Sequence, residues 1–253
     1  MNAELVKGVT VCNHMDWEST VDANRLSQIK PVSLGNRHHP VNHGDALDMF
    51  KNTLSKNHLP ILNQHGLLSN DGLKYVYVAD IHNENDYVMT NGFINFNDKT
   101  KSFTIILGDR VFICSNECFS HQISDLRRKH TGSVSEDLRG RMQVGVDRFL
   151  AFADTRRSEI SHLKEIPFNE NELGKVVLGF HRDGELSNTN IDRVINEFDN
   201  PSYPEFQERT AWNFQNSCTH VFKGITDPVR RLNMQKKMKT IIDQAIDITP
   251  IDE

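Results

Sequence analysis

The chain has 253 residues, of which 37% are hydrophobic and 25% are charged, a composition typical of a folded domain and not of a disordered protein. Its formal net charge of −5 excludes a protein that coats DNA through an overall basic charge. No apolar run approaches the roughly 20 residues that span a bilayer. The first residues lack the pattern of a signal peptide, so we expect a cytoplasmic protein that makes no membrane contact.

The first 42 residues contain little periodicity and several loop-forming prolines and glycines. Three histidines, His38, His39 and His43, lie close together around the end of this region. No carboxylate or cysteine joins them at the spacing of metal ligands, so we interpret them as part of a polar loop and predict no metal site. Asn42 then caps a predicted helix over residues 43–57.

A predicted antiparallel meander follows this helix. Runs rich in Val, Ile, Tyr and Phe alternate with turn residues, as in strands joined by short turns. Residues 97–100 form one such turn, and Gly108-Asp109 suit a two-residue hairpin with glycine at its first position. The predicted strands cover residues 59–68, 75–81, 88–96, 103–107 and 111–116.

The direction of these strands predicts which polar residues share one end of the sheet. Successive strands of a meander reverse direction. The 97–100 turn therefore lies at one end and the 108–109 turn at the other, and the strand over 111–116 returns to the first end. The loop that begins at residue 117 starts there as well. The residues expected on this rim are Asp98, Lys99, Asn116, Arg127, Arg128, Lys129, His130 and Thr131.

Helical periodicity dominates the remainder of the chain. The longest predicted helix covers residues 134–163, and Pro167 lies just beyond its end. The fold class is therefore α+β, an antiparallel β-meander preceded by one helix and followed by a long helix and a helical C-terminal part. We expect a single domain over 1–253, with a β-rich core at about 44–131 and a helical part at about 134–245. The shorter predicted helices cover residues 169–179, 191–197, 207–222 and 228–245.

The rim allows two interpretations. Its basic segment can bind phosphate through charge and hydrogen bonds, or it can be a solvated loop that leads into a helix. Asp98 and Lys99 can likewise be ordinary turn residues. The candidate residues for binding nucleic acid or another anion are Lys99, Arg127, Arg128, Lys129, His130 and Thr131. The candidate catalytic residues are Asp98, Asn116 and His130.

Other motifs narrow the range of chemistry. Four residues could in principle bind zinc, namely Cys114, Cys118, His121 and His130, but their spacing is not that of a zinc finger. No Walker loop and no GxGxxG, HExxH or GxSxG motif occurs in the chain. We therefore predict neither a metal nor another cofactor.

Four segments of the chain carry a family pattern in the same order. They are Pro40-Val41-Asn42-His43, the turn NFNDKT over 95–100, the run from VFICSN at 111–116 through Phe119-Ser120 to RKHT at 128–131, and PEFQERTAW over 204–212. Over about residues 38–240 this order resembles the phage/plasmid-like family called domain of unknown function 932. Asn97 stands where the turn of that family has a histidine, and Cys118 where the family often has alanine. The resemblance implies a protein of a bacteriophage or related mobile element and no established activity.

These features lead to three expectations about function. The first is a non-enzymatic protein that binds single-stranded nucleic acid during recombination or replication of the element. It rests on the basic rim and on an order of elements similar to that of single-strand-annealing proteins, which also suggests a homo-oligomer. The alternative is an inhibitor that binds a host antiviral defence protein, suggested by the acidic net charge. The third is a hydrolase that uses Asp98, Asn116 and His130. Each would act in the cytoplasm of the host cell.

Overall fold

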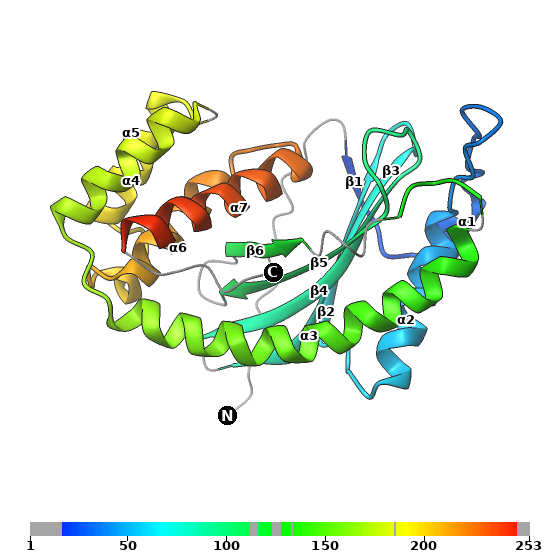
Figure 1. Cartoon of the computed structure of the whole chain (residues 1–253), viewed down its shortest axis with the longest axis horizontal. Coiled ribbons are helices and arrows are strands. Elements are labelled where there is room, and N and C mark those ends of the chain that lie inside the picture. Colours follow the sequence, from blue (N-terminus) through cyan, green and yellow to red (C-terminus); the bar gives the residue numbers. More distant parts are fainter. Residues whose placement is uncertain are drawn as a thin grey trace.

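The computed structural model describes residues 17–84, 86–111, 116–122, 128–132, 134–184 and 186–246. Within these residues, six strands form one antiparallel sheet in the order β1-β2-β3-β4-β5-β6, so each strand pairs with its neighbours in the sequence. Together with the surrounding helices they form an α+β fold, as predicted (Figure 1). The strands are β1 (Trp17–Ser19), β2 (Asn63–Ser69), β3 (Lys74–Asn83), β4 (Tyr87–Phe96), β5 (Thr104–Val111) and β6 (Asn116–Gln122).

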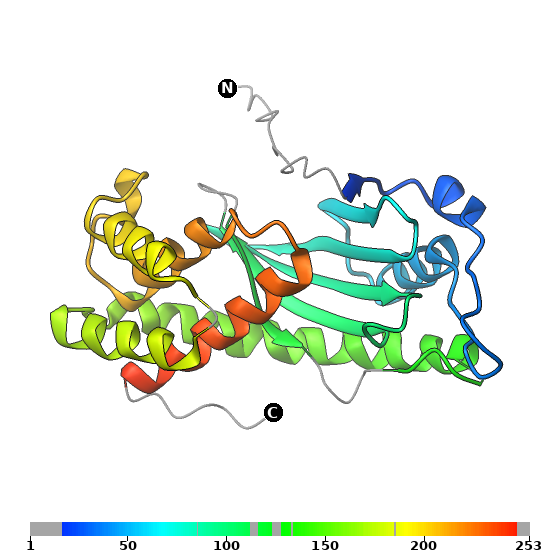
Figure 2. The same ribbon diagram turned by 90° about the horizontal axis from the view of Figure 1, so that it is seen from above.

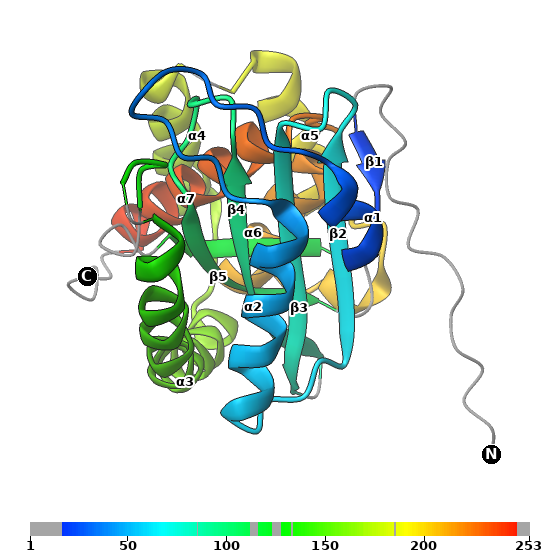
Figure 3. The ribbon, with the colours of Figure 1, turned by 90° about the vertical axis from the view of Figure 1, so that its right-hand side faces the viewer.

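Helices lie on both faces of the sheet. The helices α2 and α3 cover one face and α7 lies over the other, as Figures 1 and 2 show. Figure 3 looks at the sheet with α2 in front of it. The helices are α1 (Ala23–Gln28), α2 (His43–Lys56), α3 (Val134–Glu165), α4 (Glu170–Asp183), α5 (Asn188–Asp199), the short 3-10 helix η2 (Pro204–Phe206), α6 (Ala211–Phe222) and α7 (Pro228–Ala245).

Alternating side chains of β3 and β4 build the larger core beneath α2. Tyr77 and Phe93 point toward this helix, and the ring of Phe50 lies 5.8 Å and 5.4 Å from theirs, measured between centroids. Burying one such aromatic side chain stabilises the fold by about 1.5–3 kcal/mol. The opposite face carries a smaller cluster with α7, formed by Val78, Ile94, Phe96, Ile106 and Leu232.

Local signals predicted several helices correctly. The side chain of Asn42 accepts hydrogen bonds from the backbone N–H groups of Gly44 and Asp45, at 2.8 Å and 3.2 Å, which is the capping arrangement predicted for α2. The long helix and the last helix also begin and end within two residues of their predicted limits. The sequence did not predict β1 and α1, which are short and lie in the region interpreted as loop.

The predicted hairpin at Gly108-Asp109 is wrong, because β5 continues through both residues and pairs with β4 along its whole length. Asp109 tolerates a buried position in the strand since its Oδ1 accepts a hydrogen bond from Nε of Arg156 in α3, at 2.8 Å. The next strand is β6, which apart from Asn116 occupies residues predicted to form a loop. Residues 112–115 of the strand predicted over 111–116 lie outside the described residues. In the described part of the chain, no helix is long and apolar enough to cross a membrane.

Candidate functional site

Two asparagines at the end of β4 attach the segment before α2 to the sheet. Asn95 lies in β4 and Asn97 directly follows it, and both are buried, with 0% and 1% of their surface exposed. The side chain of Asn97 accepts a hydrogen bond from the Val41 N–H at 3.0 Å and donates one to the Val41 carbonyl at 2.9 Å. Asn95 Nδ2 donates to the same carbonyl at 2.9 Å. The carbonyl of Val41 therefore fixes the orientation of both amides.

A chain of hydrogen bonds runs from His43 through Asn95 to His130. His43 Nε2 lies 3.0 Å from the carbonyl oxygen of Gly72, which can only accept, so this nitrogen carries the proton. His43 Nδ1 then accepts from Asn95 Nδ2 at 2.9 Å. Asn95 Oδ1 in turn accepts from His130 Nε2 at 2.8 Å. His130 is thus protonated at Nε2, and its Nδ1 is the unprotonated nitrogen.

All three buried histidines of this region are uncharged at neutral pH. Burial lowers the pKa of His43 to about 4. Burial also lowers the pKa of His130 to about 4, an effect increased by His38 and His43 and opposed by the carboxylate of Asp98. The pKa of His38 is lowered by burial and by the ammonium group of Lys99. The site therefore offers hydrogen-bonding imidazoles and not imidazolium cations.

His38 brings a second imidazole beside His130, with their ring centroids 5.9 Å apart. The backbone N–H of Leu34 donates to His38 Nδ1 at 2.9 Å, so the proton of the neutral ring is on Nε2. That Nε2 is buried and has no hydrogen-bond partner. Two backbone contacts hold the His38 loop in place, since His39 N donates to the His130 carbonyl at 2.8 Å and Lys99 Nζ donates to the Leu34 carbonyl.

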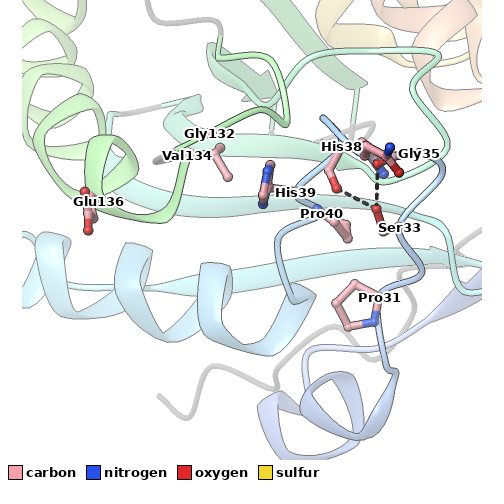
Figure 4. Close-up of a pocket in the computed structure, with 10 residues that line it drawn as sticks. Pro31, Ser33, Gly35, His38, His39, Pro40, Gly132, Val134 and Glu136 are labelled. Carbon is pink, nitrogen blue, oxygen red and sulfur yellow. Dashed lines mark hydrogen bonds between the residues drawn. The ribbon is translucent and has the colours of Figure 1, made fainter.

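An open pocket of about 760 Å³ lies between this loop and the start of α3 (Figure 4). Its walls are mainly polar or formed by proline, and Glu136 is its one acidic lining residue. His38 is part of the wall, so the pocket adjoins the histidine–asparagine chain. The lining residues are Pro31, Ser33, Gly35, Asn36, His38, His39, Pro40, Gly132, Val134 and Glu136.

The structure brings most of the predicted rim together. The segment that ends at Thr131 folds back onto the sheet, where Arg128 and Phe103 exchange backbone hydrogen bonds of 2.9 Å and 3.0 Å. Arg128 is occupied by an ion pair with Asp137 at 2.7 Å and a hydrogen bond to the Thr131 hydroxyl at 3.2 Å. Lys129 between these contacts is exposed. His130 reaches the chain described above.

The turn residues of the rim have structural contacts of their own. Asp98 Oδ1 accepts from the backbone N–H of Thr100 at 2.9 Å, and its Oδ2 lies 3.3 Å from Lys74 Nζ. Asp98 therefore closes the turn and neutralises a lysine. Lys99 adopts a left-handed backbone conformation, with φ of 68°, which turns its side chain toward the His38 loop.

Asn116 does not belong to this site. It begins β6 and pairs with Val111 at the far end of β5, not with the end that carries the 97–100 turn. β5 has eight residues, so its two ends are about 24 Å apart. The predicted position of Asn116 is wrong because it depended on a hairpin at Gly108-Asp109, which does not form. Arg127 and Cys114 lie outside the described residues.

The sequence predicts no role in the site for two residues of this chain of hydrogen bonds, His43 and Asn95. Asn95 appears only in the family pattern, and His43 appears there and, with His38, in the predicted polar loop. Asn95 and Asn97 lie two residues apart, so they share one face of a strand, and Phe93 shows that this face is buried. Two asparagines on a buried face need hydrogen-bond partners, which is the signal that could have identified them.

The described residues contain no cluster of three or more His, Cys, Asp or Glu side chains suited to a metal ion. Comparisons with known proteins found no match to this chain among family models, curated proteins or solved structures. The function must therefore be argued from the site itself, and membership of the phage/plasmid-like family stays a prediction.

Proposed function

We propose that this chain binds single-stranded nucleic acid at the pocket beside His38 and His130. In this proposal it is a protein of a bacteriophage or related mobile element that acts in the host cytoplasm, in recombination or replication of the element. One observation carries the proposal. Three exposed cations, Arg37, Lys99 and Lys129, come from three segments that contact one another beside a polar, largely uncharged pocket, although none of the three lines it.

The positions of these cations follow from the contacts of the site. Arg37 lies between two residues of the pocket wall, and Lys99 holds the loop that forms this wall. Lys129 precedes His130, whose carbonyl binds the same loop. Other cations of this end, Lys74 and Arg128, already form ion pairs with carboxylates. Exposed lysine and arginine side chains around a groove neutralise phosphates and release their counterions.

The test is binding of a fluorescein-labelled single-stranded oligonucleotide, followed by fluorescence anisotropy. We expect the affinity to fall steeply between about 50 and about 200 mM salt. Lys129→Glu should weaken binding about tenfold and reduce the slope of affinity against salt by about one. Lys56→Glu is the matched control, because Lys56 is also exposed but lies at the opposite end of α2 from His43.

Affinity that does not change with salt, or that Lys129→Glu and Lys56→Glu weaken equally, would contradict the proposal. A pull-down from host lysate, with and without nuclease, separates it from the other expectation. A host protein that is retained after nuclease treatment, with no binding of oligonucleotides, would instead support an inhibitor of host defence. Sedimentation of the protein with and without the oligonucleotide measures whether a homo-oligomer forms on the strand.

A second candidate function is hydrolysis with His130 as general base. The hydrogen bond from His130 Nε2 to Asn95 orients the ring, as a third residue orients the histidine of a nucleophilic triad. Of the predicted catalytic residues Asp98, Asn116 and His130, this candidate keeps His130 and adds Asn95 as the residue that orients it. Incubation with labelled oligonucleotides tests this candidate, since His130→Ala should abolish any cleavage while far-ultraviolet circular dichroism stays unchanged. Equal cleavage by both proteins would contradict it.

A further inference from the structure

The side chain of His38 presents an unused hydrogen-bond donor. It is 6% exposed, its Nδ1 is occupied by the Leu34 N–H, and its Nε2 is buried without a partner. A buried donor without an acceptor destabilises the protein, because the donor has lost its hydrogen bonds to water. Such a group in a pocket wall is satisfied when a bound ligand supplies the acceptor. This observation is independent of the surface cations.

The pocket beside His38 has the size and walls of a site for a small, flat, polar group. Its volume of about 760 Å³ falls in the range of about 300–1,000 Å³ that is common for small-molecule sites. Pro31, Pro40 and the exposed ring of His39 supply surfaces against which a planar group can stack. His38 contributes the donor on the same wall.

The neighbouring His130 packs beside His38 but is buried and is not among the residues that line the pocket. Its proton is held on Nε2 by Asn95, so its Nδ1 is a hydrogen-bond acceptor, and its ring lies 5.9 Å from that of His38. The edge of a nucleobase presents ring nitrogens, carbonyls and amino groups side by side, so it can supply the acceptor that His38 Nε2 lacks. Both imidazoles are neutral, which favours an uncharged base edge over a phosphate.

We propose that this pocket receives one unstacked nucleobase of the bound strand, with His38 Nε2 donating to a ring nitrogen or carbonyl oxygen of the base. The inference rests on the proposed binding of nucleic acid and adds which part of the strand is read at this site. The surface cations hold the backbone, and the pocket takes the base. Proteins that hold an unstacked base combine contacts to its edge with stacking in the same way.

The experiment compares a single-stranded oligonucleotide with the same strand made entirely of abasic residues. We expect the unaltered protein to bind the base-bearing strand about fivefold or more tightly, as is usual when one base is stacked and bonded. His38→Asn keeps an acceptor close to the position of Nδ1 for the Leu34 N–H but removes the Nε2 donor. This variant should lose most of the preference while binding the abasic strand as before.

The controls separate this inference from the proposed function. Lys129→Glu should weaken both strands by the same factor and leave the preference between them intact. His181→Asn changes an exposed histidine on α4 and should leave both affinities unchanged. Equal binding of the two strands by the unaltered protein, with the expected salt dependence, would overturn the base pocket and leave the proposed function standing. Failure to bind either strand would overturn both.

Discussion

Asn95 and His130 are joined by a hydrogen bond of 2.8 Å between the side-chain oxygen of Asn95 and Nε2 of His130, although the residues are 35 positions apart. The bond links β4 to the segment that leads into α3. Asn95 also holds His43 at the start of α2. One amide therefore sets the relative position of a strand, a helix and the loop that precedes another helix, and these three segments surround the candidate site.

Asn95→Ala tests how much this amide contributes to stability. The substitution leaves His130 Nε2 and His43 Nδ1 without partners in a buried region, so we expect the free energy of unfolding to fall by about 2–4 kcal/mol. Urea denaturation followed by circular dichroism measures this change. Asn52→Ala, at an exposed position of α2, should change stability by less than about 0.5 kcal/mol. A similar effect of the two substitutions would contradict a structural role for Asn95.

The helices were predictable because their signals are local. Asn42 caps α2 through N–H groups two and three residues ahead, and the last helix begins at Pro228, a residue suited to a first helical position. The contacts of Asn95 to His43 and His130 span 52 and 35 residues. No local pattern indicates such contacts, and only the direction of the predicted strands and the order of the family motifs suggested that these segments lie together.

The error at Gly108-Asp109 has the same physical origin. Glycine followed by aspartate favours a turn when only neighbouring residues are considered. In the folded chain, Arg156 of α3 supplies a partner for the Asp109 carboxylate, and this distant contact makes a strand the more stable conformation. The misplacement of Asn116 followed directly from that local error.

The pH dependence of stability should reflect the buried histidines. An unfolded histidine has a pKa near 6.5, whereas burial lowers the pKa of His43 and of His130 to about 4. Between these values the unfolded chain binds more protons, so the free energy of unfolding rises with pH. The stabilisation is complete above about pH 6.5 and is lost as the pH falls toward about 4, by about 3 kcal/mol for each histidine.

Urea denaturation at about pH 7 and about pH 5 measures this effect. His130→Gln keeps an amide donor near the position of Nε2 but does not titrate, so it should remove roughly half of the pH dependence. His181→Gln on the surface of α4 should retain the full dependence of the parent protein. A parent protein that is equally stable at the two pH values would show that these histidines are not buried in neutral form.

Gly44 should not tolerate a side chain. A Cβ at this position would lie against the Ser27 hydroxyl and 2.7 Å from the Ala23 carbonyl oxygen, both in α1. Gly44→Ala should therefore push α2 away from α1 and lower the free energy of unfolding by about 1–3 kcal/mol. The same shift displaces His43 from Asn95.

Gly140→Ala is the matched control, because nothing lies within 4 Å of the added Cβ in α3, and there alanine should stabilise the protein by about 0.5–1 kcal/mol. Thermal unfolding distinguishes the opposite signs.

Arg156→Met tests the buried ion pair that keeps β5 continuous. Arg156 and Asp109 are 0% and 1% exposed, and Arg156 also lies 2.8 Å from Glu159. Removing the guanidinium leaves the Asp109 carboxylate buried without its ion-pair partner, whereas Glu159 keeps Lys239, so we expect a loss of about 3–5 kcal/mol in the free energy of unfolding. Arg157→Met provides the comparison, since the next residue of α3 also pairs with two carboxylates but is 41% exposed, and it should lose less than about 1 kcal/mol.

The double variant Arg156→Met with Asp109→Leu distinguishes the contribution of the ion pair to stability from the contribution of side-chain packing. If the loss in Arg156→Met comes from an uncompensated carboxylate, replacing Asp109 by an apolar residue removes that charge, and the double variant should be more stable than Arg156→Met alone. If Arg156 acted mainly by filling space, the second substitution would add its own loss instead. Urea denaturation of the four proteins in this cycle gives the coupling energy between the two residues, and a value near zero would show that the pair does not stabilise the strand.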